Sequence, residues 1–233
     1  MNPEAAEQEL FVLRLLEETE GPVGAGTVRE FLASEGFSAS EATVGRLLRD
    51  LDRRGLTSRV GFQGRVLTDL GSRRLTELSE ARQQEASAGT LLERIHASSD
   101  DAALDLLIAR ETVEGRIARL AAERCENTSR EEVISALEGW KNPRGNDSGA
   151  MEAYRAFFET LAKLAGNGIL AAMDGILLAK DGGSALSSGA SEAVTEDLEA
   201  LAHAVCGKDP DAAENAVQTH IQRLLKGRKK QKV

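Results

Sequence analysis

The residues with the clearest chemical potential are arginines that gather between residues 38 and 74. This stretch holds eight arginines and four acids, a local charge of +4, whereas the whole chain carries a formal net charge of −9. A guanidinium group can bond bidentately to guanine or contact a backbone phosphate. The acidic remainder of the chain discourages indiscriminate binding. A specific contact with nucleic acid is therefore the chemistry that this stretch predicts.

The spacing of apolar residues predicts that a helix positions these arginines, beginning near Ser40 and ending at Gly55. Ser38 with Glu41 fits a capping box for this helix, and Ser40 is the rival cap. One face should pack and the other should stay exposed. The packed face comprises Val44, Leu47, Leu48 and Leu51, and the opposite face comprises Ala42, Arg46, Arg49 and Arg53.

Two β-prone runs, residues 57–62 and 65–68, follow the helix and are separated by the turn signal Gln63-Gly64. With two further helices expected at residues 4–19 and 27–34, this order predicts a winged helix-turn-helix. Side chains near the start of the recognition helix reach base edges best, and the wing reaches the backbone or the minor groove. A solvated arginine face on an ordinary helix is the competing interpretation. The expected DNA contacts are Ser40, Glu41, Ala42, Thr43 and Arg46 as base readers, Arg49 and Arg53 on phosphates, and Arg59, Gln63 and Arg65 in the wing.

Residues 8–78 also carry motifs of a known type of winged helix. They resemble the domain at the head of archaeal nitrogen-regulatory repressors and near the start of ribonuclease R. The downstream sequence shows no nuclease domain and no catalytic triad, so we expect no enzyme. The motifs are Val12-Leu13-Arg14-Leu15-Leu16, Gly21-Pro22-Val23-Gly24-Ala25, Ala42-Thr43-Val44, Leu51-Asp-Arg-Arg-Gly-Leu56 and Gly64-Arg-Val-Leu-Thr-Asp-Leu-Gly71.

The helical pattern divides the chain into parts, and the fold class predicted is mainly α. We expect a winged-helix domain at 1–78, a linker or linking helix at 79–90, an antiparallel helical bundle at 91–226 and a basic tail at 227–233. Thr128 with Glu131 fits a second capping box. Helices are expected at 102–124, from 128 onward, and at 150–164, 168–180, 192–206 and 210–226, with loops at 141–149 and 181–191.

The second half resembles the effector-binding helical (FCD) domain of the fatty-acid-responsive and related branches of the GntR superfamily. The usual GntR head is a different winged-helix subtype, so the resemblance does not imply the operators of that family. The matching residues are Arg110 with Glu114 ahead of Arg119–Arg124, then Ala156-Phe157 running into Ala165-Gly166-Asn167, and Lys208-Asp209 with Ala212-Ala213 and His220-Ile221.

The resemblance implies a divalent metal held by one Asp and three His, but this sequence departs from that set. The aligned positions hold Tyr154, Phe158, Leu198 and His220. Three of the four are groups that bind such metals poorly, and one imidazole is insufficient. We therefore expect neither a metal nor any other cofactor.

The resemblance still implies a small-molecule cavity, which the two aromatic replacements make more apolar. Arg110, Tyr154 and His220 are its candidate polar anchors. Arg110 suggests an acidic effector such as a carboxylate, while a salt bridge with Glu114, four residues on, is an equally weighted alternative. The expected effector-binding residues are Arg110, Glu114, Tyr154, Phe158, Leu198 and His220.

These inferences combine into a ligand-responsive regulator of transcription, a homodimer that binds a roughly two-fold DNA operator. The alternative is a dimeric DNA-binding or protein-interaction module that senses nothing. Cys125 and Cys206 are expected to be reduced, buried thiols. The absence of a leader or a long apolar run predicts a cytoplasmic protein with no membrane contact.

Overall fold

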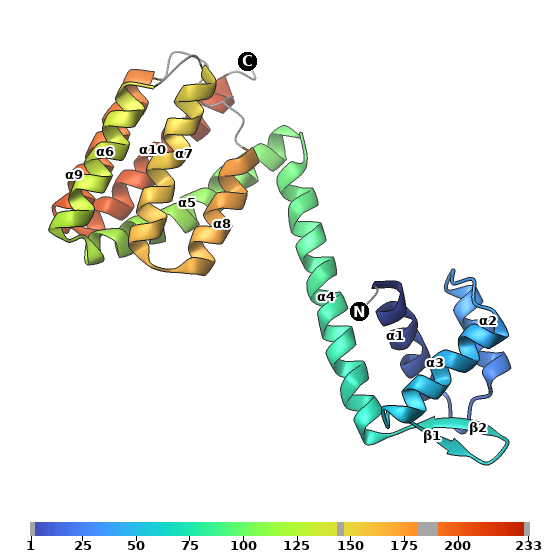
Figure 1. Ribbon diagram of the computed structural model, residues 1–233. Helices are drawn as coiled ribbons and strands as arrows, with labels where there is room; N and C mark the ends of the chain where they lie inside the picture. Colours follow the sequence, from blue (N-terminus) through green and yellow to red (C-terminus); the bar gives the residue numbers. More distant parts are fainter. Residues whose placement is uncertain (1–2, 144–146, 181–190, 231–233) are drawn as a thin grey trace. The chain divides into compact units, whose positions relative to one another are not determined.

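The computed structural model describes residues 3–143, 147–180 and 191–230. It divides into two compact units, Met1–Leu91 and Leu92–Val233. Across the described residues the chain forms ten helices and one two-stranded antiparallel sheet (Figure 1). The predicted class, mainly α with an N-terminal winged helix and a helical bundle, is confirmed.

The first unit is a three-helix cluster with a β-hairpin. Its core is aliphatic, and Val12, Leu13, Val28, Leu32 and Leu51 have no exposed surface. Burial of this kind is what fixes three short helices that would be marginal alone. The elements are α1 (Pro3–Glu18), α2 (Ala25–Ser34), α3 (Glu41–Arg53), β1 (Thr57–Val60), β2 (Gly64–Leu67) and α4 (Asp69–His96).

Helix α3 begins directly after Ser40, the second of the two candidate N-caps. The backbone N–H of Thr43 donates to the Ser40 hydroxyl at 3.2 Å, so Ser40 and not Ser38 is the N-cap. The predicted packed stripe is correct, because Val44, Leu48 and Leu51 are buried.

The hairpin loop begins two residues earlier than the Gln63-Gly64 signal predicts. Val60 pairs with Gly64, so residues 61–63 form the loop and Gly64 belongs to β2. Gly61 has φ +53°, in the left-handed region that favours glycine. Gly64 has φ +137°, and a Cβ there would lie 2.3 Å from the carbonyl oxygen of Val23. Glycine at 64 therefore serves a close backbone contact, which its sequence neighbours alone do not reveal.

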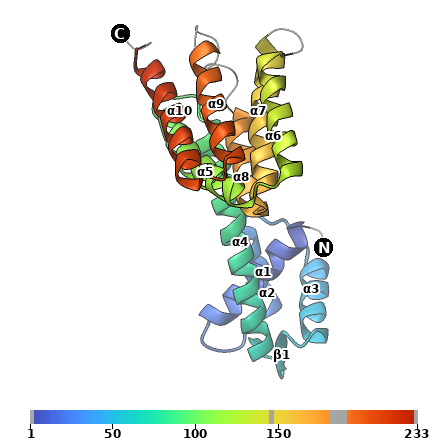
Figure 2. The same cartoon turned by 90° about the vertical axis from the view of Figure 1, so that its left-hand side faces the viewer.

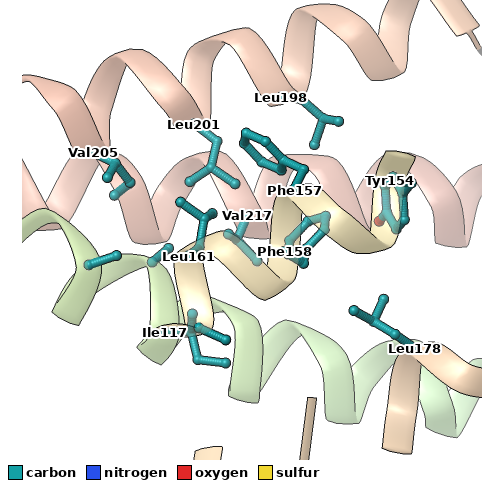
Figure 3. Packing of buried hydrophobic residues seen from close by; sticks show 14 of the residues in the cluster. Ile117, Tyr154, Phe157, Phe158, Leu161, Leu178, Leu198, Leu201, Val205 and Val217 are labelled. Atoms are coloured by element: carbon teal, nitrogen blue, oxygen red, sulfur yellow. The ribbon is translucent and has the colours of Figure 1, made fainter. Parts of the chain in front are cut away.

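The second unit is an all-helical bundle, in which α6, α7, α9 and α10 run alongside one another (Figure 2). Helix α7 contributes Phe157, Phe158 and Leu161 to the core, facing α9 on one side and α5 on the other (Figure 3). The helices are α5 (Asp100–Arg124), α6 (Asn127–Lys141), α7 (Asp147–Ala165), α8 (Gly168–Lys180), α9 (Ser191–Cys206) and α10 (Pro210–Lys230).

Several expected boundaries change. The capping box of Thr128 and Glu131 is wrong, because α6 starts at Asn127 and Glu126 precedes it without a side-chain cap. Residues 79–90 are helical, within α4, which is the second of the two alternatives expected for them, and α10 continues to Lys230. The expected loop at 181–191 lies outside the described residues except for Ser191, as does the end of the expected tail from residue 231.

The two cysteines are not joined by a disulfide. Cys125 is buried, Cys206 is half-buried, and both are free thiols. Within the part of the chain that the structure describes, none of the helices is both long and apolar enough to span a membrane.

Candidate DNA-binding surface and buried polar cluster

The outer face of α3 presents the arginines that the sequence placed there. Arg46 and Arg49 are exposed, and the side chain of Arg53 is 80% exposed although it bonds to Asp50. These side chains sit opposite the buried stripe, so they can reach a partner without disturbing the core. Helix α3 therefore offers three guanidinium groups on one accessible face.

The start of α3 is partly used by the fold itself. The Ser40 hydroxyl accepts the Thr43 N–H and lies 3.0 Å from the Thr43 hydroxyl. Ser40 is exposed and Thr43 is half-buried. Contact with a base would therefore compete with the cap, whereas Arg46, one turn further on, has no such constraint.

The wing holds two arginines directly opposite each other, Arg59 and Arg65. The side chain of Arg59 is 69% exposed and lies 3.7 Å from Asp52. The side chain of Arg65 is only 9% exposed, and its Nε donates to both Asp52 carboxylate oxygens, at 2.9 and 3.0 Å. Arg65 therefore ties β2 to α3, which leaves little of its side chain free for the expected contact with the DNA backbone or minor groove. Gln63 is exposed at the turn.

Asp52 is the anchor of this arrangement. It also accepts a hydrogen bond from the Thr57 hydroxyl at 2.6 Å. Burial alone would raise the pKa of Asp52, but hydrogen bonds from Arg65 and Thr57 and the positive charge of Arg65 lower it below its ordinary value. Asp52 is thus held as a carboxylate that braces the base of the wing.

A second internal ion pair cluster lies around Glu9, which is 2% exposed. Arg54 donates to both of its oxygens at 2.6 and 2.8 Å, and Arg74 donates at 2.9 Å. Burial would raise the pKa of Glu9, and these two arginines lower it. Arg54, Arg65 and Arg74 are therefore structural, which leaves a smaller set of arginines for DNA than the sequence count suggests.

In the second unit, the predicted effector residues form a buried polar cluster. Arg110 donates through Nε to Glu114 at 2.5 Å and through Nη2 to the Tyr154 hydroxyl at 2.6 Å. That hydroxyl lies 2.8 Å from His220 Nε2, and His220 Nδ1 lies 3.2 Å from Asp197. All five side chains are at most 6% exposed. A neutral imidazole protonated at Nδ1 satisfies both contacts, donating to Asp197 and accepting from Tyr154.

The remaining predicted positions are apolar neighbours of this cluster. The Phe158 ring centroid lies 4.9 Å from that of Tyr154 and 6.3 Å from that of His220. Leu198 belongs to the same hydrophobic core with no exposed surface. The structure thus brings Arg110, Glu114, Tyr154, Phe158 and His220 into one buried cluster.

Sequence reasoning missed Asp197, which links the cluster to the surface. Arg223 donates to both Asp197 oxygens at 2.9 Å, and the Arg223 side chain is 43% exposed. Burial would raise the pKa of Asp197, whereas His220 and Arg223 lower it. The separation of Arg223 from His220 by three residues on α10 was the available signal, because it places both on one helix face.

It also missed Asp174 on α8, a 1% exposed acid. Asp174 Oδ1 and Glu114 Oε2 are buried acceptors that have no hydrogen-bond partner among the described residues. The pKa of Asp174 is raised to about 7, mainly because the side chain is buried and secondly because Glu114 is negatively charged. The positive charge of Arg110 opposes this rise. These two carboxylate oxygens can therefore accept further hydrogen bonds, although the neighbouring Arg110, Tyr154 and His220 are already hydrogen-bonded to one another.

The cluster does not fit a divalent metal. Across residues 3–143, 147–180 and 191–230 no group of three or more His, Cys, Asp or Glu side chains converges as metal ligands would. Two of the aligned ligand positions hold Phe158 and Leu198, which have no donor atom, and both nitrogens of His220 already have partners. A divalent metal such as zinc needs several convergent donor atoms, which this cluster does not supply.

One hollow on this unit lies apart from the residues of the predicted cavity. It is an open groove of about 700 Å³ over α6 and α7, lined by small and acidic side chains. Its lining residues are Thr128, Glu131, Glu132, Ser135, Ala136, Gly139, Ala153, Ala156 and Thr160.

A winged helix with an exposed arginine face, followed in the chain by an all-helical effector domain, defines a DNA-binding transcriptional regulator. The FCD domain matches residues 105–223, just over half of the chain, and the ribonuclease R winged-helix domain matches residues 10–75. The chain belongs to the FCD domain family.

Parts of the chain are also similar to known proteins and solved structures. The global nitrogen regulator NrpRI of Methanosarcina mazei is 34% identical over 77 residues, which cover 33% of this chain and 24% of that protein. The chain thus matches about a quarter of the length of that curated relative. Among solved structures, Streptococcus agalactiae GntR has a TM-score of 0.45 at 18% identity, covering 96% of this chain and 99% of that one. E. coli McbR/YncC has a TM-score of 0.45 at 16% identity, covering 99% and 97%.

Proposed function

We propose that this regulator binds a roughly two-fold DNA operator through α3 and the wing. The observation that carries the proposal is the exposed face of α3, where Arg46, Arg49 and Arg53 stand opposite a buried stripe. Arg46 is the candidate base reader, while Arg49, Arg53 and Arg59 are candidates for phosphates. A DNA-binding regulator acts where the chromosome is, so we propose a cytoplasmic location.

Selection of bound fragments from the source genome tests this directly. Wild-type protein should enrich a small set of fragments that share a two-fold sequence, because specific binding exceeds non-specific binding by orders of magnitude. A charge-matched control is Arg116→Ala, which removes an exposed arginine from α5 and should enrich the same set. If wild-type protein enriches no common sequence, the DNA-binding proposal fails.

The effector is proposed to bind at the buried polar cluster. Glu114 already neutralises Arg110, so a carboxylate alone would have to displace Glu114 or the Tyr154 hydroxyl. The unsatisfied oxygens of Glu114 and Asp174 call for hydrogen-bond donors. These two demands together favour a small acid that also carries an amino or hydroxyl group. Such a molecule would shift the equilibrium between conformations that differ in affinity for DNA.

A thermal-shift panel distinguishes effector classes. Simple carboxylates, simple amines and molecules with both groups would be compared on the full chain, with DNA affinity measured for any compound that raises Tm. The combined class should give the largest shift. Asp174→Asn should reduce that preference, because the amide presents a donor where the effector's donor would bind.

One observation favours the alternative, a dimeric DNA-binding or protein-interaction module that senses nothing. Arg110, Tyr154 and His220 satisfy one another and are at most 2% exposed, as in a filled core. If no compound of the panel changes Tm or DNA affinity, this second reading is the correct one.

We also propose a homodimer formed through the helical unit. Ile169, Met173 and Ile176 form one exposed apolar stripe on α8, with 76%, 44% and 40% of their surface exposed. A two-fold operator requires two heads, and a second copy of this chain would cover the stripe. Light scattering should give a dimer for wild type and a monomer for Ile169→Glu. Ile134→Glu, on α6, is the matched control and should stay dimeric; a monomeric wild type would contradict the proposal.

A further inference from the structure

The tip of the wing carries a fully exposed aromatic ring. The side chain of Phe62 is fully exposed, and the neighbouring Val60 is 36% exposed. A single exposed apolar side chain on a protein surface is ordinary. Phe62 differs from such a residue because it lies at the tip of the wing, on a hairpin that is anchored to the rest of the domain.

The hairpin that presents Phe62 is anchored at its base. The ladder between β1 and β2 ends at the pair Val60–Gly64, and the Gln63 N–H donates to the Val60 carbonyl at 3.0 Å. Val23 exchanges two backbone hydrogen bonds with Arg65, at 2.8 and 3.0 Å. The Arg65–Asp52 ion pair then joins β2 to α3. Phe62 is therefore held at a set distance from the arginine face rather than on a free loop.

The electrostatic surroundings of the ring favour a polyanion. Between Asp52 and Asp69 the sequence holds sixteen residues and no acid. Arg59, on the strand that leads to the tip, is 69% exposed. Arg59 shares Asp52 with Arg65, so one of these two positive charges remains unbalanced. A tip that combines an apolar ring with a nearby exposed guanidinium, on a segment without an acid of its own, matches the wall of a DNA groove, where sugars and base edges lie between phosphates.

We propose that Phe62 enters the minor groove beside the site read by α3 and packs against sugars and base edges there. This inference rests on the proposed DNA-binding function and adds an uncharged contact to it. Apolar side chains inserted in the minor groove lean on or partly open a base step, and flexible pyrimidine–purine steps yield most readily. The ring would thus add affinity and a preference for sequence at a position that no arginine reads.

The salt dependence of operator binding separates this contact from a phosphate contact. Phe62→Ala should weaken binding roughly tenfold while leaving the slope of log K against log salt unchanged, because no phosphate contact is lost. Arg59→Ala should weaken binding and make the slope shallower by about one. Phe62→Leu should retain most of the affinity, since leucine is also an effective apolar wedge. Because the Phe62 side chain is fully exposed, all Phe62 variants should melt at the wild-type temperature.

A second arm changes the DNA instead of the protein. Replacing a pyrimidine–purine step in the operator flank by a stiff A-tract should weaken wild type more than Phe62→Ala. Equal operator affinity of wild type and Phe62→Ala overturns the inference while the DNA-binding function stands. If affinity is equal but Phe62→Ala loses self-association in light scattering, the ring makes a protein contact and the inference is likewise overturned. If wild type itself binds no selected fragment, the underlying function has failed instead.

Discussion

The hydroxyl of Tyr154 lies 2.8 Å from Nε2 of His220, inside the helical bundle. Both residues stand at positions where the resemblance to metal-binding FCD domains places ligands. Here the phenol accepts from Arg110 and leaves its own proton for His220. A hydrogen-bonded chain of side chains thus occupies the region where such domains hold an ion.

The first prediction is that the bundle needs no metal. Purified protein should carry well under one equivalent of divalent metal, and a chelator should leave Tm unchanged, because the described residues bring no set of three or more ligands together at His220. Metal analysis by mass spectrometry with a melting curve measures both. Stoichiometric zinc or nickel, lost together with stability on chelation, would show that the ligand alignment is displaced.

The second prediction concerns pH and Asp174. Its folded pKa of about 7 lies above the ordinary value of 3.8. The folded state therefore favours the protonated acid, and the resulting stability is full below about pH 4 and is lost as pH rises to about 7. Asp174→Asn should be more stable than wild type by a few kcal/mol at pH 8. The difference should shrink steadily towards pH 4; a difference independent of pH would contradict the buried acid.

The third prediction compares the cross-strand pair Arg59 and Arg65. Arg65→Ala should cost about 1–3 kcal/mol of stability, because Asp52 loses its principal partner while 23% of its side chain stays exposed. Arg59→Ala should cost almost none. Since the pKa of Asp52 is lowered, the stability from Asp52 is present above about pH 4 and lost as pH falls, so the Arg65→Ala penalty should fade in acid. Urea melts at pH 7 and pH 3 would measure this, and equal melts for both variants would refute it.

The fold could be predicted in large part because it depends on local patterns. The apolar spacing on α3 and the turn glycines are properties of neighbouring residues. The shifted hairpin turn shows the limit of such patterns. The β propensity of Phe62 assigned it to a strand, whereas the contact of Gly64 with Val23, distant in sequence, sets the register. In this register Phe62 lies in the loop at the tip of the wing, where we propose its contact with DNA.

For the candidate site, the sequence predicted the exposure of a side chain only where that exposure depends on its position around a single helix. Exposure of Arg46 and Arg49 follows from helical period. The burial of Arg65 does not, because it depends on Asp52, thirteen residues away on another element. Asp174 and Asp197 were missed for the same reason: the charged groups around them lie on other helices of the bundle. Charge counting cannot separate an arginine that binds a partner from one that braces the fold.

The central claim is that α3 reads DNA, and titration of a selected operator with Arg46→Ala tests it most directly. Arg46 is exposed on the outer face of α3, opposite the buried stripe, so the variant should fold as wild type does. Arg46→Ala should lose about 1–3 kcal/mol of operator affinity and discriminate less between the operator and a scrambled duplex. Arg116→Ala should match wild type on both duplexes. If Arg46→Ala binds and discriminates as wild type does, α3 is not the reading element.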